Sequence, residues 1–96
     1  MQINLSPVRS SDTLLVFRAG DLLIINDVGF DFTQLPEGAT LPAEAVGSDN
    51  FVGPVERING ELHLTLRLPH GPNPSQAAAF PQPITVTQDG PVELPV

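Results

Sequence analysis

The fold is decided by one stretch of the chain, Val55-Glu56-Arg57-Ile58-Asn59-Gly60-Glu61-Leu62-His63-Leu64-Thr65-Leu66-Arg67-Leu68. From Glu61 to Leu68, polar and apolar residues alternate strictly, so the leucines share one face and the polar residues share the other. A period of two residues is typical of a strand that is buried on one side only. Asn59-Gly60 accepts the two positive φ angles of a type I′ turn, so the stretch predicts a β-hairpin.

The length of the hairpin loop determines which residues face each other. A bulged three-residue loop places Arg57 opposite Glu61, whereas a two-residue loop makes Glu56 and His63 meet on the polar face as an ion pair. The sequence leaves both open, and we favour the two-residue loop. Its facing pairs are Ile58 with Glu61, Arg57 with Leu62, Glu56 with His63, and Val55 with Leu64.

A second hairpin is predicted earlier in the chain. Residues 13–18 and 21–25 flank Ala19-Gly20, a register in which Arg18 and Asp21 close the turn as an opposite-charge pair. Because these segments are apolar on both faces, we expect them in the middle of the fold, covered from two sides. Asn26-Asp27 then turns the chain into residues 28–32, which completes a three-stranded meander.

The two hairpins share a short pattern, Val-x-Arg before the turn and Gly-acid-Leu after it. The match is too short to distinguish an internal duplication from two hairpins that happen to have charged turn flanks.

Eleven prolines and eight glycines divide the remaining chain into pieces that are too short for ordinary helices. We expect two loops, each with one helical turn, and two short strands near the end. The loops are residues 34–50 and 69–83, the helical turns lie near 42–46 and 75–79, and the strands lie near 84–87 and 92–94.

The outer strands of a small β domain need protection from unwanted pairing. Residues 2–8 and 92–96 are the expected edges, and Pro7, Pro91 and Pro95 limit pairing only near the strand ends. We therefore predict that Gln2–Leu5 is the stretch most able to accept a strand from another chain.

A chain of 96 residues has room for one core, which must be built from Leu, Ile, Val and Phe because Trp and Tyr are absent. We predict an all-β fold, a small antiparallel sandwich or partly open barrel of short strands and hairpins. Residues 1–96 are expected to form a single β domain.

The charge and cysteine content exclude several classes. Eleven acids, four arginines and no lysine give a net charge of -7, which disfavours nucleic acid and anionic lipid as partners. No apolar run exceeds four residues, such as Leu22–Ile25, and the first residues lack a basic stretch followed by an apolar one, so we expect neither a membrane segment nor a signal peptide. Without cysteine there is no disulfide framework, thiolate zinc site or Cys nucleophile.

No arrangement of residues matches a known chemistry. His63 and His70 are two possible ligands where a metal site needs more, and we expect His63 to pair with Glu56 and His70 to lie in a solvated loop. Asp27 with Asp31, and Asp49 with Asn50, lack the oxygen spacing of a calcium loop. We therefore predict no catalytic, cofactor-binding or metal-binding residues and no cofactor.

Two proline-rich segments, Leu68–Pro74 and Phe80–Pro83, resemble ligands of aromatic grooves. We expect stiff loops instead.

The chain is similar to small proteins encoded in bacteriophages and prophages of proteobacteria. The resemblance implies a gene near tail genes and carries over no activity and no site residues. The residues that carry it are 55–66, Leu68-Pro69-His70-Gly71-Pro72-Asn73, 84–92, Asn4-Leu5-Ser6-Pro7-Val8-Arg9-Ser10, Ala19-Gly20-Asp21 and Phe30-Asp31-Phe32.

The resulting expectation is a non-enzymatic structural or tail-assembly accessory protein of phage origin that acts through protein–protein contacts. Its partners are other phage proteins or further copies of itself, and its location is the host cytoplasm or the virion. Two alternatives remain, a small-ligand or carbohydrate-binding β module, which the lack of Trp and Tyr disfavours, and a hydrolase that uses His63 or His70.

Overall fold

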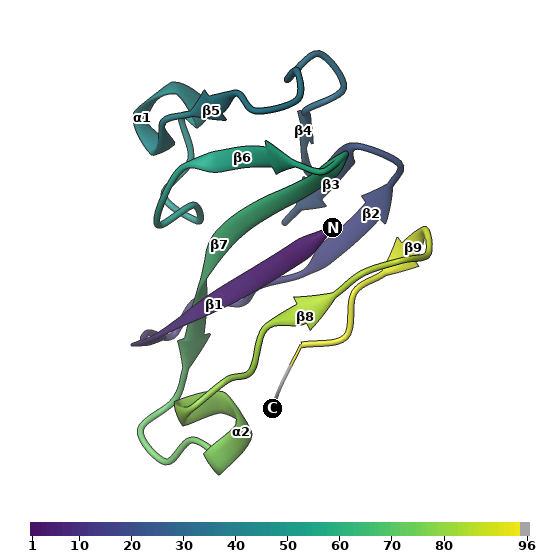
Figure 1. The fold of residues 1–96 in the computed structure, drawn as a ribbon. Coiled ribbons are helices and arrows are strands. Elements are labelled where there is room, and N and C mark those ends of the chain that lie inside the picture. The colour runs from purple at the N-terminus through teal and green to yellow at the C-terminus, as the bar shows by residue number, and fades with distance from the viewer. Residues whose placement is uncertain (95–96) are drawn as a thin grey trace.

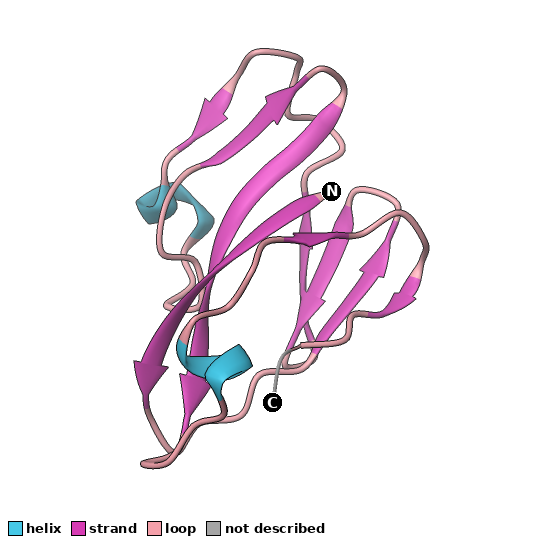
Figure 2. Ribbon diagram, turned by 60° about the horizontal axis from the view of Figure 1, so that its bottom comes forward, coloured by secondary structure: helices cyan, strands magenta, loops and turns pink. Residues whose placement is uncertain are grey.

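The structure is a computed structural model that describes residues 1–94 (Figure 1). Its strands form a five-stranded sheet, in the order β5-β6-β7-β1-β8, and a four-stranded sheet, in the order β4-β3-β2-β9 (Figure 2). The predicted all-β class is confirmed, and the described strands do not close into a barrel. The elements are β1 Gln2–Arg9, β2 Val16–Ala19, β3 Leu22–Ile25, β4 Val28–Asp31, β5 Thr40–Leu41, α1 Ala43–Val46, β6 Val55–Ile58, β7 Glu61–His70, α2 Gln76–Ala79, β8 Ile84–Thr85 and β9 Gly90–Pro91.

The hairpin of β6 and β7 has the predicted two-residue loop. Asn59 and Gly60 have φ angles of 53° and 78°, as a type I′ turn requires. The observed pairs are Ile58 with Glu61, Arg57 with Leu62 and Glu56 with His63, and the strand pairing ends there, without the predicted pair of Val55 and Leu64. On the N-terminal side of Gly53-Pro54, Phe51 pairs with Leu66 of β7 in an isolated bridge.

The register predicted for the hairpin of β2 and β3 is wrong. Ala19 pairs with Leu22, so the loop is Gly20-Asp21, and Arg18 lies opposite Leu23 instead of Asp21. Only Gly20 of the two loop residues has a positive φ, which suits a type II′ turn with glycine first. The displacement is two residues along β3, an even number, so every side chain keeps its expected face.

The two hairpins are not equivalent in detail. Gly20 is the first residue of its loop and Gly60 the second, so Asp21 lies in a turn whereas Glu61 begins a strand. The shared sequence pattern therefore falls on different positions of the two turns and does not support a duplication.

The prediction that β2 and β3 are covered from two sides is also wrong. Both are central strands of the four-stranded sheet, and Val16, Leu23 and Ile25 are buried on its inner face. On the outer face Phe17 is 44% exposed, and Leu15 just before β2 is 66% exposed.

The prediction that residues 2–8 form an edge strand is wrong for the start of the strand. β1 lies between β7, with which it pairs in parallel along its whole length, and β8, which pairs with Gln2 and Ile3. The five-stranded sheet is therefore mixed. β8 occupies the free side of Gln2 and Ile3, so the predicted acceptor Gln2–Leu5 is not open at these two residues, whereas no described strand pairs with that side of Asn4 and Leu5. A partner that returns from residue 84 leaves no trace in the local pattern, which explains the error.

The shorter elements follow the predictions in part. Both helical turns form, with Pro42 as the N-cap of α1 and Ser75 as the N-cap of α2. β5 lies inside the first predicted loop, and β7 continues to His70, past the expected start of the second. The last strand lies at Gly90–Pro91, before the expected 92–94, and the end of the predicted edge at 95–96 lies outside the described residues.

One apolar cluster fills the space between the inner faces of the two sheets. The predicted leucine face is confirmed, because all four leucines from Leu62 to Leu68 are buried. Phe51 contacts the edges of two further rings, with centroids 5.2 Å from Phe30 and 5.9 Å from Phe32. The buried cluster consists of Met1, Ile3, Leu14, Val16, Leu23, Ile25, Phe32, Phe51, Val55, Leu62, Leu64, Leu66, Leu68 and Val86.

Candidate functional site

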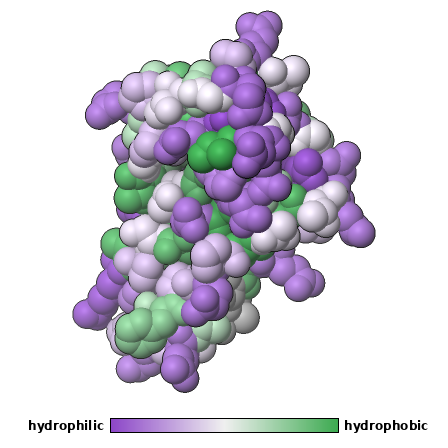
Figure 3. All heavy atoms as spheres, in the orientation of Figure 1, coloured by the Kyte–Doolittle hydropathy of each residue, from purple (hydrophilic) through white to green (hydrophobic). Residues whose placement is uncertain are grey.

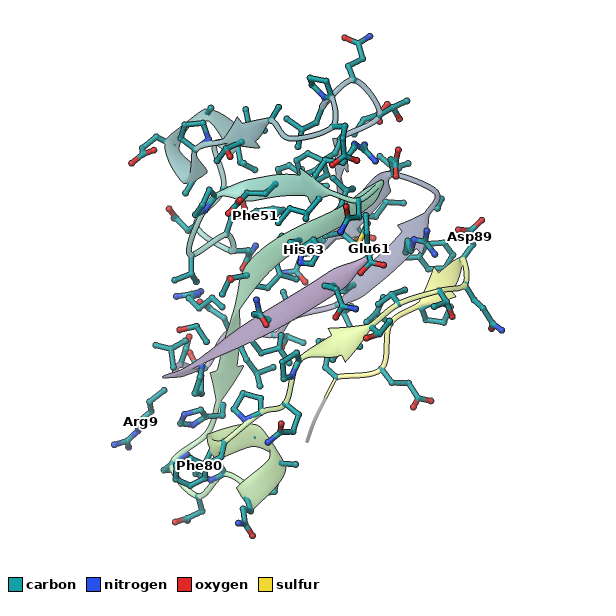
Figure 4. All side chains as sticks on the ribbon, viewed as in Figure 1. Arg9, Phe51, Glu61, His63, Phe80 and Asp89 are labelled. Atoms are coloured by element: carbon teal, nitrogen blue, oxygen red, sulfur yellow. The ribbon has the colours of Figure 1, made fainter. Side chains whose placement is uncertain are left out.

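The two histidines do not form a common site. His63 projects from the outer face of β7 beside Glu61 (Figure 4), and no ion pair with Glu56 is present among the described residues, so that part of the prediction is wrong. His70 ends the same strand, with its Nδ1 atom 2.8 Å from the carbonyl oxygen of Gly71. Seven residues of strand separate the two rings by roughly 23 Å.

Two of the four residues considered for calcium, Asp31 and Asn50, have other roles. The Asp31 carboxylate accepts hydrogen bonds from the hydroxyl and the backbone N–H of Thr33, which together hold the pKa of Asp31 below its usual value. Asn50 donates its N–H to the Ser48 hydroxyl in a local turn. Within residues 1–94, no three His, Asp or Glu side chains gather closely enough to hold a metal ion.

Only the start of the first proline-rich segment differs from the loops that were expected. Leu68–His70 belongs to β7 and pairs with β1, so this part is a strand. Phe80 follows α2 and is 74% exposed at the end of the molecule where Arg9 also projects (Figure 4).

Arg57 joins the two sheets. Its side chain, 13% exposed, lies on the inner side of β6 opposite Leu62. The Nη2 atom donates to an Asp21 carboxylate oxygen at 3.1 Å and to the Phe32 carbonyl oxygen at 2.8 Å, and Nε donates to the Leu35 carbonyl oxygen. Asp21 therefore pairs with Arg57 rather than with Arg18, which donates to the Gly20 carbonyl oxygen. Sequence analysis missed this because 36 residues separate the partners.

Two more carboxylates hold the hairpin turns in place. Glu37 accepts the backbone N–H groups of Asn59 and Gly60 in the turn between β6 and β7. Asp89, at the tip of the connection between β8 and β9 (Figure 4), accepts the N–H of Gly20 at 2.8 Å. These contacts give the acids a structural task and no obvious chemistry.

An apolar groove runs along β2 and joins the outer face of the four-stranded sheet to buried residues such as Leu14 and Val16. Phe17 of β2 lies opposite Ile24 of β3 on one side and Pro91 of β9 on the other, so the three side chains form a row across the sheet. The groove has a volume of about 400 Å³. Its lining residues are Leu14, Leu15, Val16, Phe17, Ile24, Asp27, Pro91, Val92 and Leu94.

One acidic residue lines this groove, and three more lie around the sheet that carries it. Asp27 lines the groove itself, and Asp31 of β4 lies opposite Leu22 at the far edge of the sheet. Asp89 bonds to the turn at Gly20, and Glu93 lies in the chain between two lining residues. Arg18, which lies opposite the buried Leu23, belongs to the inner face. The apolar centre therefore has an acidic border.

The five-stranded sheet presents a different outer surface. A row of polar residues crosses all five strands, and the Thr85 hydroxyl donates to the Gln2 side-chain oxygen at 3.1 Å. Hydrophilic side chains cover much of this side of the molecule, and apolar ones appear only in separate small areas (Figure 3). The row consists of Thr40, Glu56, His63, Gln2 and Thr85.

No helix in the described part of the chain has the length and apolar character needed to cross a membrane. Comparisons of the sequence with protein-family models and with curated proteins, and of the fold with solved structures, found no match.

Proposed function

We propose that this protein is a non-enzymatic structural or tail-assembly accessory protein of phage origin that acts by docking onto another protein. The observation that carries the docking role is the apolar groove lined by Leu15, Phe17 and Ile24, which residues 1–94 leave open. Contiguous exposed apolar surface is rare on monomers that have no partner, and it marks interaction sites.

The groove differs from an ordinary scatter of exposed apolar side chains. Leu15 and Phe17 expose 66% and 44% of their surface, and they adjoin Ile24 and Pro91 within one continuous depression. Large side chains in a concave, apolar patch with a polar border are the usual centre of a protein–protein interface. A partner that covers the groove removes this surface from water.

The phage context is supported by the sequence resemblance alone. It implies a partner encoded by a neighbouring tail gene and a location in the host cytoplasm or the virion. The net charge of -7 favours a protein partner over nucleic acid or an anionic lipid surface.

A small-ligand-binding module is the second candidate, and the groove volume of about 400 Å³ favours it. Phe17 is the one aromatic side chain that lines the groove, which leaves little surface for stacking a sugar ring. An open groove on a sheet face suits a protein side chain better than a free metabolite, which enzymes and receptors usually enclose.

The test is a pair of matched variants. Phe17→Asp charges the groove, and Ile58→Asp charges a side chain of similar exposure, 42%, at the end of β6 in the other sheet. We expect wild type and Ile58→Asp to be captured by one of the neighbouring tail-gene products in pull-down and light scattering, and Phe17→Asp to lose this capture while it stays folded. Equal capture of all three proteins, or capture of none, would contradict the proposal, and saturable binding of a small molecule that Phe17→Asp abolishes would favour the second candidate.

A further inference from the structure

Asp27 is an unusual residue at the border of the groove. It follows Asn26 in the two-residue turn between β3 and β4, and both have left-handed backbones, with φ of 49° for Asn26 and 70° for Asp27. Such type I′ turns favour asparagine followed by glycine, because glycine adopts a positive φ without steric cost. Asp27 therefore occupies a position that glycine would fill with less strain.

The two turn residues differ in what their side chains do. The Asn26 amide oxygen accepts the N–H of Leu15 at 2.8 Å, and its nitrogen donates to the Thr13 carbonyl oxygen at 2.9 Å. These bonds hold the segment before β2 against the turn. The Asp27 carboxylate makes no hydrogen bond or ion pair to the residues that the structure describes. Asn26 thus has a structural role, whereas Asp27 lines the groove and its carboxylate has no partner among the described residues.

We infer that the groove receives a large apolar side chain of a partner protein, next to a lysine or arginine whose charge lies against Asp27. This inference rests on the proposed docking function and names the chemistry of the partner. A volume of about 400 Å³ accommodates one aromatic or leucine side chain together with part of its backbone. A carboxylate without a partner, beside an apolar pocket, is best paired with lysine or arginine, because the methylene groups of these side chains also pack against the apolar surface.

A second copy of the chain, joined face to face through its own groove, does not fit this description. The chain has no lysine, and two of its four arginines already form ion pairs, Arg57 with Asp21 and Arg67 with Asp12. Two copies joined through this face would bring their acidic borders together, at a net charge of -7 each. The partner we infer is a different protein with a basic border around an apolar anchor, and self-association of the purified chain through its exposed Phe80 and Arg9, detected by light scattering, would contradict this.

The test uses three capped dipeptides as probes, N-acetyl-phenylalanyl-lysine amide, N-acetyl-phenylalanyl-glutamate amide and N-acetyl-alanyl-lysine amide. Titration followed by amide NMR shifts at Leu15, Phe17 and Ile24 reports binding at the groove. We expect the phenylalanyl-lysine probe to bind at least fivefold more tightly than either of the others at low salt, and this preference to shrink at high salt.

The decisive variant is Asp27→Gly, with Asp49→Gly as a control that removes an equal charge away from the groove lining. Asp27→Gly should lose the preference for lysine over glutamate while its unfolding midpoint stays equal or rises, which a purely structural role for Asp27 would not produce. Asp49→Gly should keep the preference. If all phenylalanyl probes shift the groove equally in the wild type, or if Asp27→Gly keeps the lysine preference, the inference is wrong although docking at the groove stands. If no probe shifts the groove, the inference is wrong, and the pull-down with Phe17→Asp decides separately on the docking function.

Discussion

The two sheets treat their outer faces differently. In the five-stranded sheet, the strand β7 alternates between buried leucines and outer polar residues such as His63 and Thr65. In the four-stranded sheet, Phe17 and Ile24 on the outer face are as apolar as Val16 and Ile25 on the inner face, and the described chain leaves the outer pair partly exposed. A strand that is apolar on both faces thus indicates that each face is packed against other residues. The sequence does not tell whether those residues belong to the same chain or to a partner.

The largest expected effect compares one leucine from each sheet. Leu64 is 1% exposed in the core, so Leu64→Ala should lower the free energy of unfolding by about 2–5 kcal/mol. Leu15→Ala, on the open face, should change it by about 0.5 kcal/mol or less, and Thr65→Ala, next to Leu64, should cost far less than Leu64→Ala. Urea denaturation measures all three. Similar costs for Leu64 and Leu15 would show that the outer face is covered in the free protein.

The second comparison concerns one arginine from each hairpin. Arg57→Ala leaves the Asp21 carboxylate and the Leu35 carbonyl oxygen without this donor and removes one of the two donors to the Phe32 carbonyl oxygen, so it should cost about 2–3 kcal/mol. Arg18→Ala removes one exposed bond to the Gly20 carbonyl oxygen and should cost about 0.5 kcal/mol or less. Thermal and urea unfolding test this, and a small effect of Arg57→Ala would mean that the contact between the sheets is not held by this side chain.

The third comparison sets two left-handed turn positions against each other. Gly60, with φ of 78°, cannot take a β-branched side chain without strain, so Gly60→Val should destabilise the protein by at least about 1 kcal/mol. Asp27→Gly, at φ of 70°, should stabilise it by about 0.5 kcal/mol because the strain is relieved. Opposite shifts of the denaturation midpoint are expected, and a midpoint unchanged by Gly60→Val would argue against the turn.

The smallest expected effect is a change in the pKa values of two exposed carboxylates, Asp31 and Asp12. The Thr33 hydroxyl and N–H lower the pKa of Asp31, whereas the Arg67 guanidinium and then the Ser10 hydroxyl lower that of Asp12. A folded pKa below the unfolded value contributes stability that is present above the unfolded pKa, near 3.8, and is lost as pH falls through the folded pKa. NMR titration should show that Thr33→Val raises the pKa of Asp31 and leaves Asp12 unchanged.

High salt provides the matching control. It should raise the pKa of Asp12, whose first partner is charged, more than that of Asp31, whose donors are neutral. If salt raised both pKa values equally, a charged group would have to lie near Asp31 as well.

The parts of the fold that sequence analysis predicted well are local. Asn59-Gly60 and the alternation that follows it correctly predicted the loop length, three facing pairs and the buried leucine face. The register of β2 and β3 was missed because Ala19-Gly20 and Gly20-Asp21 are both plausible loops. Type II′ turns prefer glycine at their first position, and this preference favours Gly20-Asp21 as the loop.

The groove was not predicted as a site, although its residues were noticed. The apolar run around Phe17 and the run at Leu22–Ile25 indicated burial from both sides, and the structure leaves one side open. The contact between Asp21 and Arg57 likewise requires the two sheets to be placed first.

By itself the sequence determined the β class, the two-residue turn at Asn59-Gly60 and the inward face of β7, because turn chemistry and a period of two act over a few residues. Only the tertiary structure decided that β1 lies inside a sheet, in parallel with β7 and next to β8, and that Arg57 reaches Asp21. It also decided that the outer apolar face of β2 and β3 stays open. These features depend on which distant segments meet, and that choice is made by the shared burial of the whole core rather than by any one segment.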